Sequence, residues 1–214
     1  MPSAASPVLL AAGWTIAASV QSRPYDPVAD TVSALAGISA SDRWVMTLIF
    51  VLAGVCDVVT GLALRSARTA GRLMLMAGGI AGILVAASPV RTGDGAPVLH
   101  IIWAAVGVVA LAVWPVAASY RGQAVPWALR PAISAWVAVI LLGLLAWFGL
   151  KPITAVGQAG QAERVLGEAQ AVWPFLVVMS CRHPVSVTAR DRLLPECGAS
   201  GPRSAASRTC SAPR

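Results

Sequence analysis

The hydrophobic positions of this chain fall in long blocks, separated by shorter polar segments. A helix needs about 20 largely apolar residues to cross a membrane. Six blocks meet or approach that length, and they predict helices over residues 4–21, 44–64, 73–90, 98–119, 131–150 and 164–180. The pattern therefore predicts an all-α fold, a polytopic transmembrane bundle of about six spans.

The first and last blocks are the least typical of membrane spans. A secretory signal peptide carries a basic segment before its apolar core, and none precedes the block at 4–21. We therefore interpret that block as a retained first helix. The block at 164–180 carries Glu168 and Gln170 in its first turns. An amphipathic segment lying on the membrane surface is the alternative for this block.

The composition excludes an ordinary water-soluble domain. Hydrophobic residues make up 57% of the 214 residues and charged residues 12%, about half the charged share of a soluble domain. The mean hydropathy is +0.73. The net charge of +7 could indicate nucleic acid, but no stripe of basic residues alternates with aromatic ones. We expect the lipid bilayer as partner and no nucleic acid.

The basic residues also predict the orientation. Eleven of them lie on the side of the second and fourth connections and the C-terminal segment, and five lie on the other side. Cytoplasmic loops collect Lys and Arg, so the first side is expected to be cytoplasmic. With an even number of spans, both termini lie in the cytoplasm of a multi-pass protein of the cell membrane. The two groups are Arg65, Arg68, Arg72, Arg121, Arg130, Arg182, Arg190, Arg192, Arg203, Arg208 and Arg214, against Arg23, Arg43, Arg91, Lys151 and Arg164.

The chain divides into a transmembrane domain over residues 1–180 and a tail over residues 181–214. The tail is rich in Pro, Ser, Arg and Gly and has no apolar periodicity, which predicts disorder. Its charge could hold it against anionic lipid; a segment that is not native to the protein is the other interpretation. The four cysteines fit no zinc spacing and predict free thiols. We expect no cofactor and no metal.

Glycines in the predicted spans indicate where helices approach one another. Gly78 and Gly82 form a GxxxG pattern in the third predicted helix, and Gly54 and Gly61 share one side of the second. Small residues of this kind let helix backbones come close together in lipid. We interpret them as packing positions, with no claim about dimers.

Asp57 is the most informative polar residue, because it lies inside the second predicted helix. It follows Trp44 by thirteen residues, which at 1.5 Å per residue places it roughly 20 Å along the helix and inside the hydrocarbon. An ionised carboxylate there costs several kcal/mol unless it is paired, hydrated or protonated. It shares a face with Gly54 and Gly61, so we expect it to point into the bundle. It is either a proton or cation relay, or a structural carboxyl bonded to a neighbouring helix or paired with an arginine of the next loop.

His100 opens the fourth predicted helix at its outer end, and it is the only histidine outside the tail. By depth it should lie well over about 10 Å from Asp57. A histidine, acids and a serine at a membrane surface can support hydrolysis or ion binding; a solvated histidine at a helix end is the alternative. With Asp57 and His100, the candidate functional residues are Asp26, Asp30 and Arg43. Further expected neighbours of His100 are Asp42, Asp94, Glu163, Glu168 and Ser33.

The first outer loop is expected to be ordered. Asp26-Pro27 combines a capping residue with a first-turn proline, which is typical of a helix start. Gly37 would end a short helix that carries Val32 and Leu35. We expect this segment to lie on the outer face of the bundle.

The same region carries a resemblance to a known family. Tyr25-Asp-Pro27, Thr31-Val-Ser-Ala-Leu35 and Asp42-Arg-Trp-Val-Met-Thr47 resemble the signature of the bacterial and archaeal membrane proteins called domain of unknown function 998. Gly71-Arg72, Pro89, His100 and the Trp-Pro ending of the fourth helix are also similar. The resemblance covers residues 5–179 and leaves out the tail. It implies a multi-helix membrane protein and no settled activity.

Two functions follow from these observations. The first is a non-enzymatic bundle that binds or moves a small solute, ion or lipid by means of Asp57 and the outer loop. The second is a membrane-embedded enzyme that acts on lipid at the outer face, centred on His100. No HExxH, GxSxG, Walker or Rossmann pattern is present in the sequence. The first function is therefore favoured.

Overall fold

A computed structural model describes residues 2–91, 96–122, 124–154 and 157–182, and the described part is helical with no strand. Asp94 and the tail from residue 183 onward lie outside these residues. The helices are α1 (Pro2–Ser19), α2 (Val32–Leu35), α3 (Trp44–Ala63), α4 (Thr69–Ala86), α5 (Val98–Ala118), the 3-10 turn η1 (Trp127–Leu129), α6 (Pro131–Thr154) and α7 (Ala159–Arg182). The predicted all-α class is confirmed.

Four of these helices are long and apolar enough to cross a membrane. They are α3, α4, α5 and the Pro131–Leu150 part of α6. Many of their large apolar side chains are exposed, including Trp136 and Val139 of α6. An exposed apolar surface of this extent is what a lipid-facing helix requires. The number of spans that length and composition support is thus four, against about six predicted.

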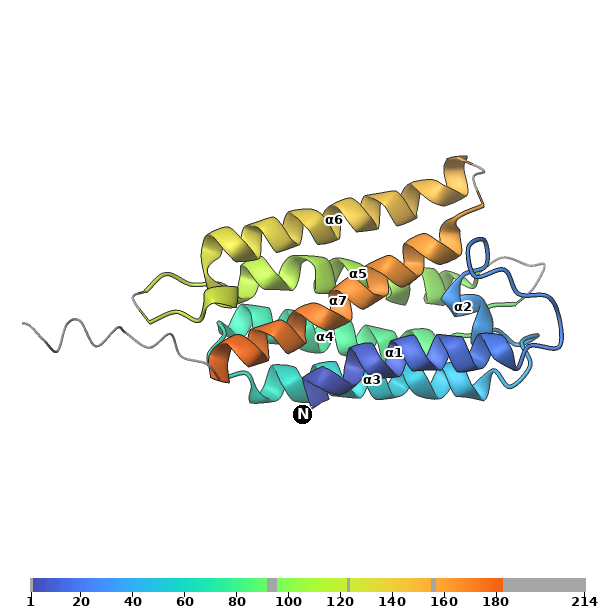
Figure 1. Ribbon diagram of the computed structural model, residues 1–214, viewed down its shortest axis with the longest axis horizontal. Coiled ribbons are helices and arrows are strands. Elements are labelled where there is room, and N and C mark those ends of the chain that lie inside the picture. The colour runs from blue at the N-terminus through green and yellow to red at the C-terminus, as the bar shows by residue number, and fades with distance from the viewer. Residues whose placement is uncertain (1, 92–95, 123, 155–156, 183–214) are drawn as a thin grey trace, which may run out of the picture. The chain divides into compact units, whose positions relative to one another are not determined.

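The six long helices form a closed ring in chain order. Each packs against its neighbours along the chain, α7 packs against α1, and α5 also contacts α7. Figure 1 shows the helices side by side and alternating in direction, with the connections after α1, α4 and α6 at one end. Short connections favour antiparallel neighbours of this kind. Because α7 packs against α1, α5 and α6, it is part of the bundle rather than a separate amphipathic segment.

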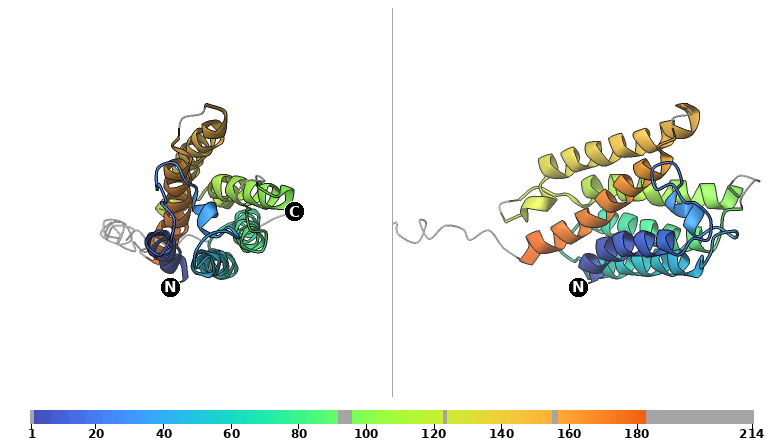
Figure 2. Two further views of the ribbon diagram at one scale, coloured as in Figure 1. Left: turned by 90° about the vertical axis from the view of Figure 1, so that its right-hand side faces the viewer. Right: turned by 45° about the vertical axis from the view of Figure 1, so that its right-hand side comes forward.

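Residues 20–43, which we call the cap loop, fold over the end of the ring where α1 finishes. The end-on view shows α2 among the ends of the long helices (Figure 2). The two limbs of the loop are tied by Gln21, whose side-chain nitrogen donates to the Ser41 carbonyl at 2.9 Å, and by the Ser22 and Ser41 hydroxyls at 2.7 Å. Ile38 donates its N–H to the Val90 carbonyl at 2.9 Å. The loop is ordered by these bonds, and we call this end of the ring the cap end.

The short helix of the cap loop begins later than predicted. Thr31 is its N-cap residue, and its side chain accepts a hydrogen bond from the N–H of Ala34. Asp26 instead accepts from the N–H of Val28 at 2.9 Å and holds a turn. An Asp side chain that bonds two residues onward stabilises a turn in place of a helix start. The predicted helix start at Asp26 was therefore wrong: Asp26 stabilises a turn, and the helix begins at Val32.

Two helices begin several residues before the predicted starts, where the sequence is still polar. α4 includes Arg72, whose guanidinium donates to the carbonyls of Gly61 and Leu62 at the end of α3. α7 begins at Ala159, because the N–H groups of Gly160 and Gln161 donate to carbonyls of the cap loop. Helix ends need such partners for their free N–H and C=O groups. Hydropathy marks only the apolar middle of a helix and misses these turns.

Candidate functional site

A cavity of about 620 Å³ lies inside the ring. Every long helix contributes to its wall, and so does α2 of the cap loop. Apolar side chains and glycines make up most of the lining, with a few polar groups among them. The polar members are Ser6, Thr31, Ser33, Asp57, His100, Glu163 and Gln170.

The cavity exists because side chains are missing from its wall. Seven of the lining residues are glycines. A Cβ atom placed on Gly82, Gly149 or Gly167 would meet nothing within 4 Å. The predicted GxxxG pair therefore divides in the structure: Gly78 packs against Leu111 of α5, whereas Gly82 leaves space. Glycine here creates volume as well as close packing.

Asp57 projects into this cavity from α3. It is 8% exposed, and among the described residues its carboxyl group has no hydrogen-bond or ion-pair partner. Neither of the structural partners considered for it, a neighbouring helix or an arginine of the next loop, is bonded to it in the described part of the chain. Phe50, Ala53 and Gly54 line the cavity from the same face of the helix.

His100 lines the same cavity from the cap end of α5. It is 7% exposed, so it is a buried side chain and not a solvated one. Its Nδ1 lies 2.8 Å from the backbone carbonyl of Ser88. A carbonyl only accepts, so Nδ1 carries a proton and Nε2 is left as the second functional atom of the ring. The structure thus brings His100 and Asp57 to one cavity.

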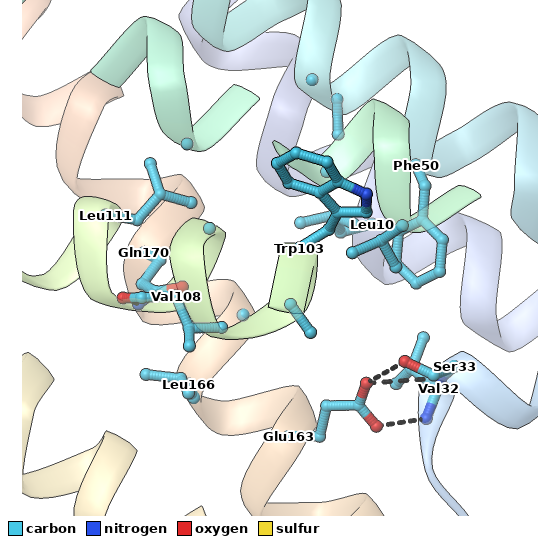
Figure 3. A pocket seen from close by; sticks show the side chains of 18 of the residues that line it. Leu10, Val32, Ser33, Phe50, Trp103, Val108, Leu111, Glu163, Leu166 and Gln170 are labelled. Atoms are coloured by element: carbon cyan, nitrogen blue, oxygen red, sulfur yellow. Dashed lines mark hydrogen bonds between the residues drawn. The ribbon is translucent and has the colours of Figure 1, made fainter. Parts of the chain in front are cut away.

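Glu163 links the cavity to the cap loop. Its carboxylate accepts hydrogen bonds from the N–H of Val32 at 2.6 Å, the N–H of Ser33 at 3.3 Å and the Ser33 hydroxyl at 2.8 Å. Figure 3 shows this carboxylate reaching from α7 to the first turn of α2. The acceptors of Glu163 are therefore occupied, and its role in this arrangement is to hold the cap in place.

Arg164 is a second residue of α7 that bonds to the cap loop. Its guanidinium donates to the Pro27 carbonyl and to the Tyr25 hydroxyl, and it lies 5.5 Å from the centre of the Tyr25 ring. The Tyr25 hydroxyl in turn lies 3.1 Å from the Asp30 carbonyl. Burial raises the pKa of Tyr25 to about 12, against the lowering effect of Arg164. Tyr25 therefore stays a neutral donor throughout the physiological range.

The remaining candidates lie apart from the cavity. Asp30 accepts a hydrogen bond from the N–H of Asp26 at 2.9 Å, so both acids serve the turn of the cap loop. Arg43 is exposed and precedes the first turn of α3. An enzyme centre would require at least two of these residues within hydrogen-bonding reach of His100. None of them lines the cavity, and the acids bond locally within the described residues.

Gln170 is a site residue that was not among the predicted candidates. Its amide donates to the Val108 carbonyl of α5 at 2.8 Å, and its side chain is buried. Glu163, Leu166, Gly167 and Gln170 line the cavity at a spacing of three, four and seven residues. That spacing marks one face of a helix. It was visible in the sequence, but Glu168 and Gln170 were considered together as polar interruptions.

The fold and the site define an all-helical protein of the membrane-spanning kind, with a largely apolar internal cavity. The family described as "Protein of unknown function (DUF998)" matches residues 4–180, and the chain belongs to this family. The resemblance seen in the sequence is thereby confirmed. No curated protein and no solved structure matched the chain.

Proposed function

We propose that this protein binds a small, predominantly apolar molecule inside its ring of helices. The cavity of about 620 Å³ carries the proposal. Ligand sites are typically clefts of about 300–1,000 Å³ with apolar walls and a few polar groups that orient the ligand. This cavity has that size and that lining.

We further propose that all six long helices cross the cell membrane. α1 and α7 close the ring beside four strongly apolar helices, and the cavity wall needs them both. A ring that lies within lipid draws an apolar ligand from the bilayer itself. With six spans, both termini and the arginine-rich connections lie in the cytoplasm.

The binding proposal is tested with benzophenone, a small neutral photolabel, on the full chain in lipid nanodiscs. Irradiation followed by mass spectrometry locates the labelled residues. We expect labels on cavity residues such as Leu10 and Leu166 as well as on the lipid-facing Trp136 and Val139. Labels confined to lipid-facing residues would show that the cavity takes up no apolar molecule.

Two glycines provide a matched pair of variants. Gly167→Phe places a ring in the cavity, and Gly143→Phe places the same ring on an exposed part of α6, with nothing within 4 Å of the added Cβ in either case. We expect Gly167→Phe to lower labelling of the cavity about fivefold, which corresponds to roughly 1 kcal/mol. Gly143→Phe should leave it unchanged. Equal cavity labelling in both variants would argue against the proposal.

A further inference from the structure

The carboxyl group of Asp57 is the one strongly polar side chain of the cavity that points inward without a partner among the described residues. It is 8% exposed and lines the cavity. An unpaired carboxylate in an apolar setting is destabilising, and either protonation or a nearby positive charge relieves the cost. The other acid of the lining, Glu163, already accepts three hydrogen bonds from the cap loop.

Among the described residues, no Arg or Lys lines this cavity. Arg72 donates to carbonyls at the end of α3, and Arg164 faces Pro27 and Tyr25. His100 lines the cavity as well, and its Nδ1 donates to the Ser88 carbonyl and so is turned away from Asp57. With no Arg or Lys in the described lining, a permanent positive charge at Asp57 would come from a ligand.

Two aromatic rings lie in the wall of the same cavity. Phe50 precedes Asp57 by seven residues, which places the two on the same face of α3, and Trp103 follows His100 by three residues on α5. Figure 3 shows the rings of Phe50 and Trp103 projecting from these two helices, with Leu10 of α1 between them in this view. The faces of aromatic rings attract cations, most of all where water is excluded.

We infer that the ligand of this cavity is a lipophilic cation, an apolar molecule that carries one positively charged nitrogen, with that nitrogen against Asp57. The inference rests on the proposed function and adds the charge of the ligand to it. Apolar walls, with the Phe50 and Trp103 rings among them, hold the body of the molecule, and Asp57 is the counter-ion of its nitrogen. A neutral or anionic ligand would leave an ionised Asp57 without a counter-ion.

The test uses two photolabels of the same shape. The first is (4-benzoylbenzyl)trimethylammonium, which is permanently charged, and the second is 4-(2,2-dimethylpropyl)benzophenone, in which carbon replaces the nitrogen. Each is titrated against the full chain and against Asp57→Asn in nanodiscs, and labelling of cavity residues is quantified. We expect Asp57→Asn to raise the half-labelling concentration of the cation about tenfold. That of the neutral probe should not change, and this comparison cancels the different partitioning of the two probes.

The outcomes separate this inference from the proposed function. If both probes label the cavity and Asp57→Asn shifts neither, the cavity binds apolar molecules but the inference of a cationic ligand is wrong. If neither probe labels the cavity, the proposed function itself fails.

If Asp57→Asn does not fold, a competition experiment in the wild-type protein decides. Benzyltrimethylammonium should protect the cavity from the cationic probe. Equal protection by neutral neopentylbenzene would overturn the inference. Asp57→Glu, which keeps the charge, should retain binding of the cation.

Discussion

Two glutamates of α7 have opposite surroundings. Glu163 accepts three hydrogen bonds from the first turn of α2, whereas Glu168 has a buried carboxylate oxygen with no partner among the described residues. Hydrogen bonds to a charged group are worth about 1.5–3 kcal/mol, and a buried group left unpaired costs a similar amount. The two acids should therefore contribute to stability with opposite signs.

We predict that Glu163→Ala lowers the free energy of unfolding by roughly 2–3 kcal/mol, because two N–H groups and a hydroxyl of the cap loop lose their acceptor. Glu168→Ala should leave stability unchanged or raise it. The measurement is the thermal unfolding midpoint of each purified variant in one detergent. Equal losses in both variants would show that Glu163 does not hold the cap loop.

For single residues, the sequence indicated how far along its helix a polar side chain lies. It did not indicate which groups that side chain bonds to. Asp57 was recognised because a charged residue inside a hydrophobic block is conspicuous. The partners of His100 and Glu163 are a backbone carbonyl and backbone N–H groups. Backbone groups are present at every position and leave no mark on the sequence, so only the folded chain shows which of them is used.

Glycines mark a close approach between α3 and α4, two neighbouring helices of the ring. A Cβ on Gly54 would lie 2.4 Å from the Gly79 carbonyl oxygen, and a Cβ on Gly79 would lie 2.5 Å from the Gly54 carbonyl oxygen. The two backbones thus touch directly, at the level of Asp57. Close backbone approach of this kind is the reason for small residues at helix interfaces in lipid.

We predict that Gly54→Ala and Gly79→Ala each destabilise the protein by about 1–3 kcal/mol, as extra atoms forced into a packed contact do. Gly82→Ala is the matched control. It lies less than one turn after Gly79 on the same helix, and its Cβ would meet nothing within 4 Å. Because alanine favours helix over glycine by about 1 kcal/mol, the control should be as stable as the wild type or more so. Thermal unfolding in detergent measures all three.

The helices themselves were accessible from the sequence, and their packing partners were not. Long apolar blocks predict long helices, and the six long helices of the structure overlap the six predicted segments. The predicted packing positions Gly54, Gly61 and Gly78 are packed, whereas Gly82 leaves space. The spacing did not single out Gly79, which is the partner of Gly54. In a glycine-rich span the spacing matches several positions, and the rotation of the helix decides among them.

For the whole molecule, the closed ring of helices bears on the proposed number of spans. Four helices are apolar enough to cross a membrane by themselves. α1 and α7 pack against each other and complete the wall of the cavity. If either lay on the membrane surface, the wall would be open to lipid on that side. The ring and its cavity are therefore the structural argument for the proposed six spans, beside the four helices that length and composition support.

Cysteine labelling tests the six spans directly. In a chain whose native cysteines are replaced by serine, single cysteines at Ser22 and Gly157 should react with a membrane-impermeant maleimide in intact cells. Single cysteines at Pro2, Ser66 and Arg182 should react only after permeabilisation. All five positions are exposed. The first two belong to the connections after α1 and α6 at the cap end, and the other three lie at the opposite ends of the helices (Figure 1). Equal reactivity at Pro2 and Ser22 would show that α1 does not cross, and equal reactivity at Gly157 and Arg182 would show the same for α7. Either result would leave the cavity without a lipid-embedded wall. It would therefore contradict both the proposed six spans and the proposed binding of an apolar ligand drawn from the bilayer.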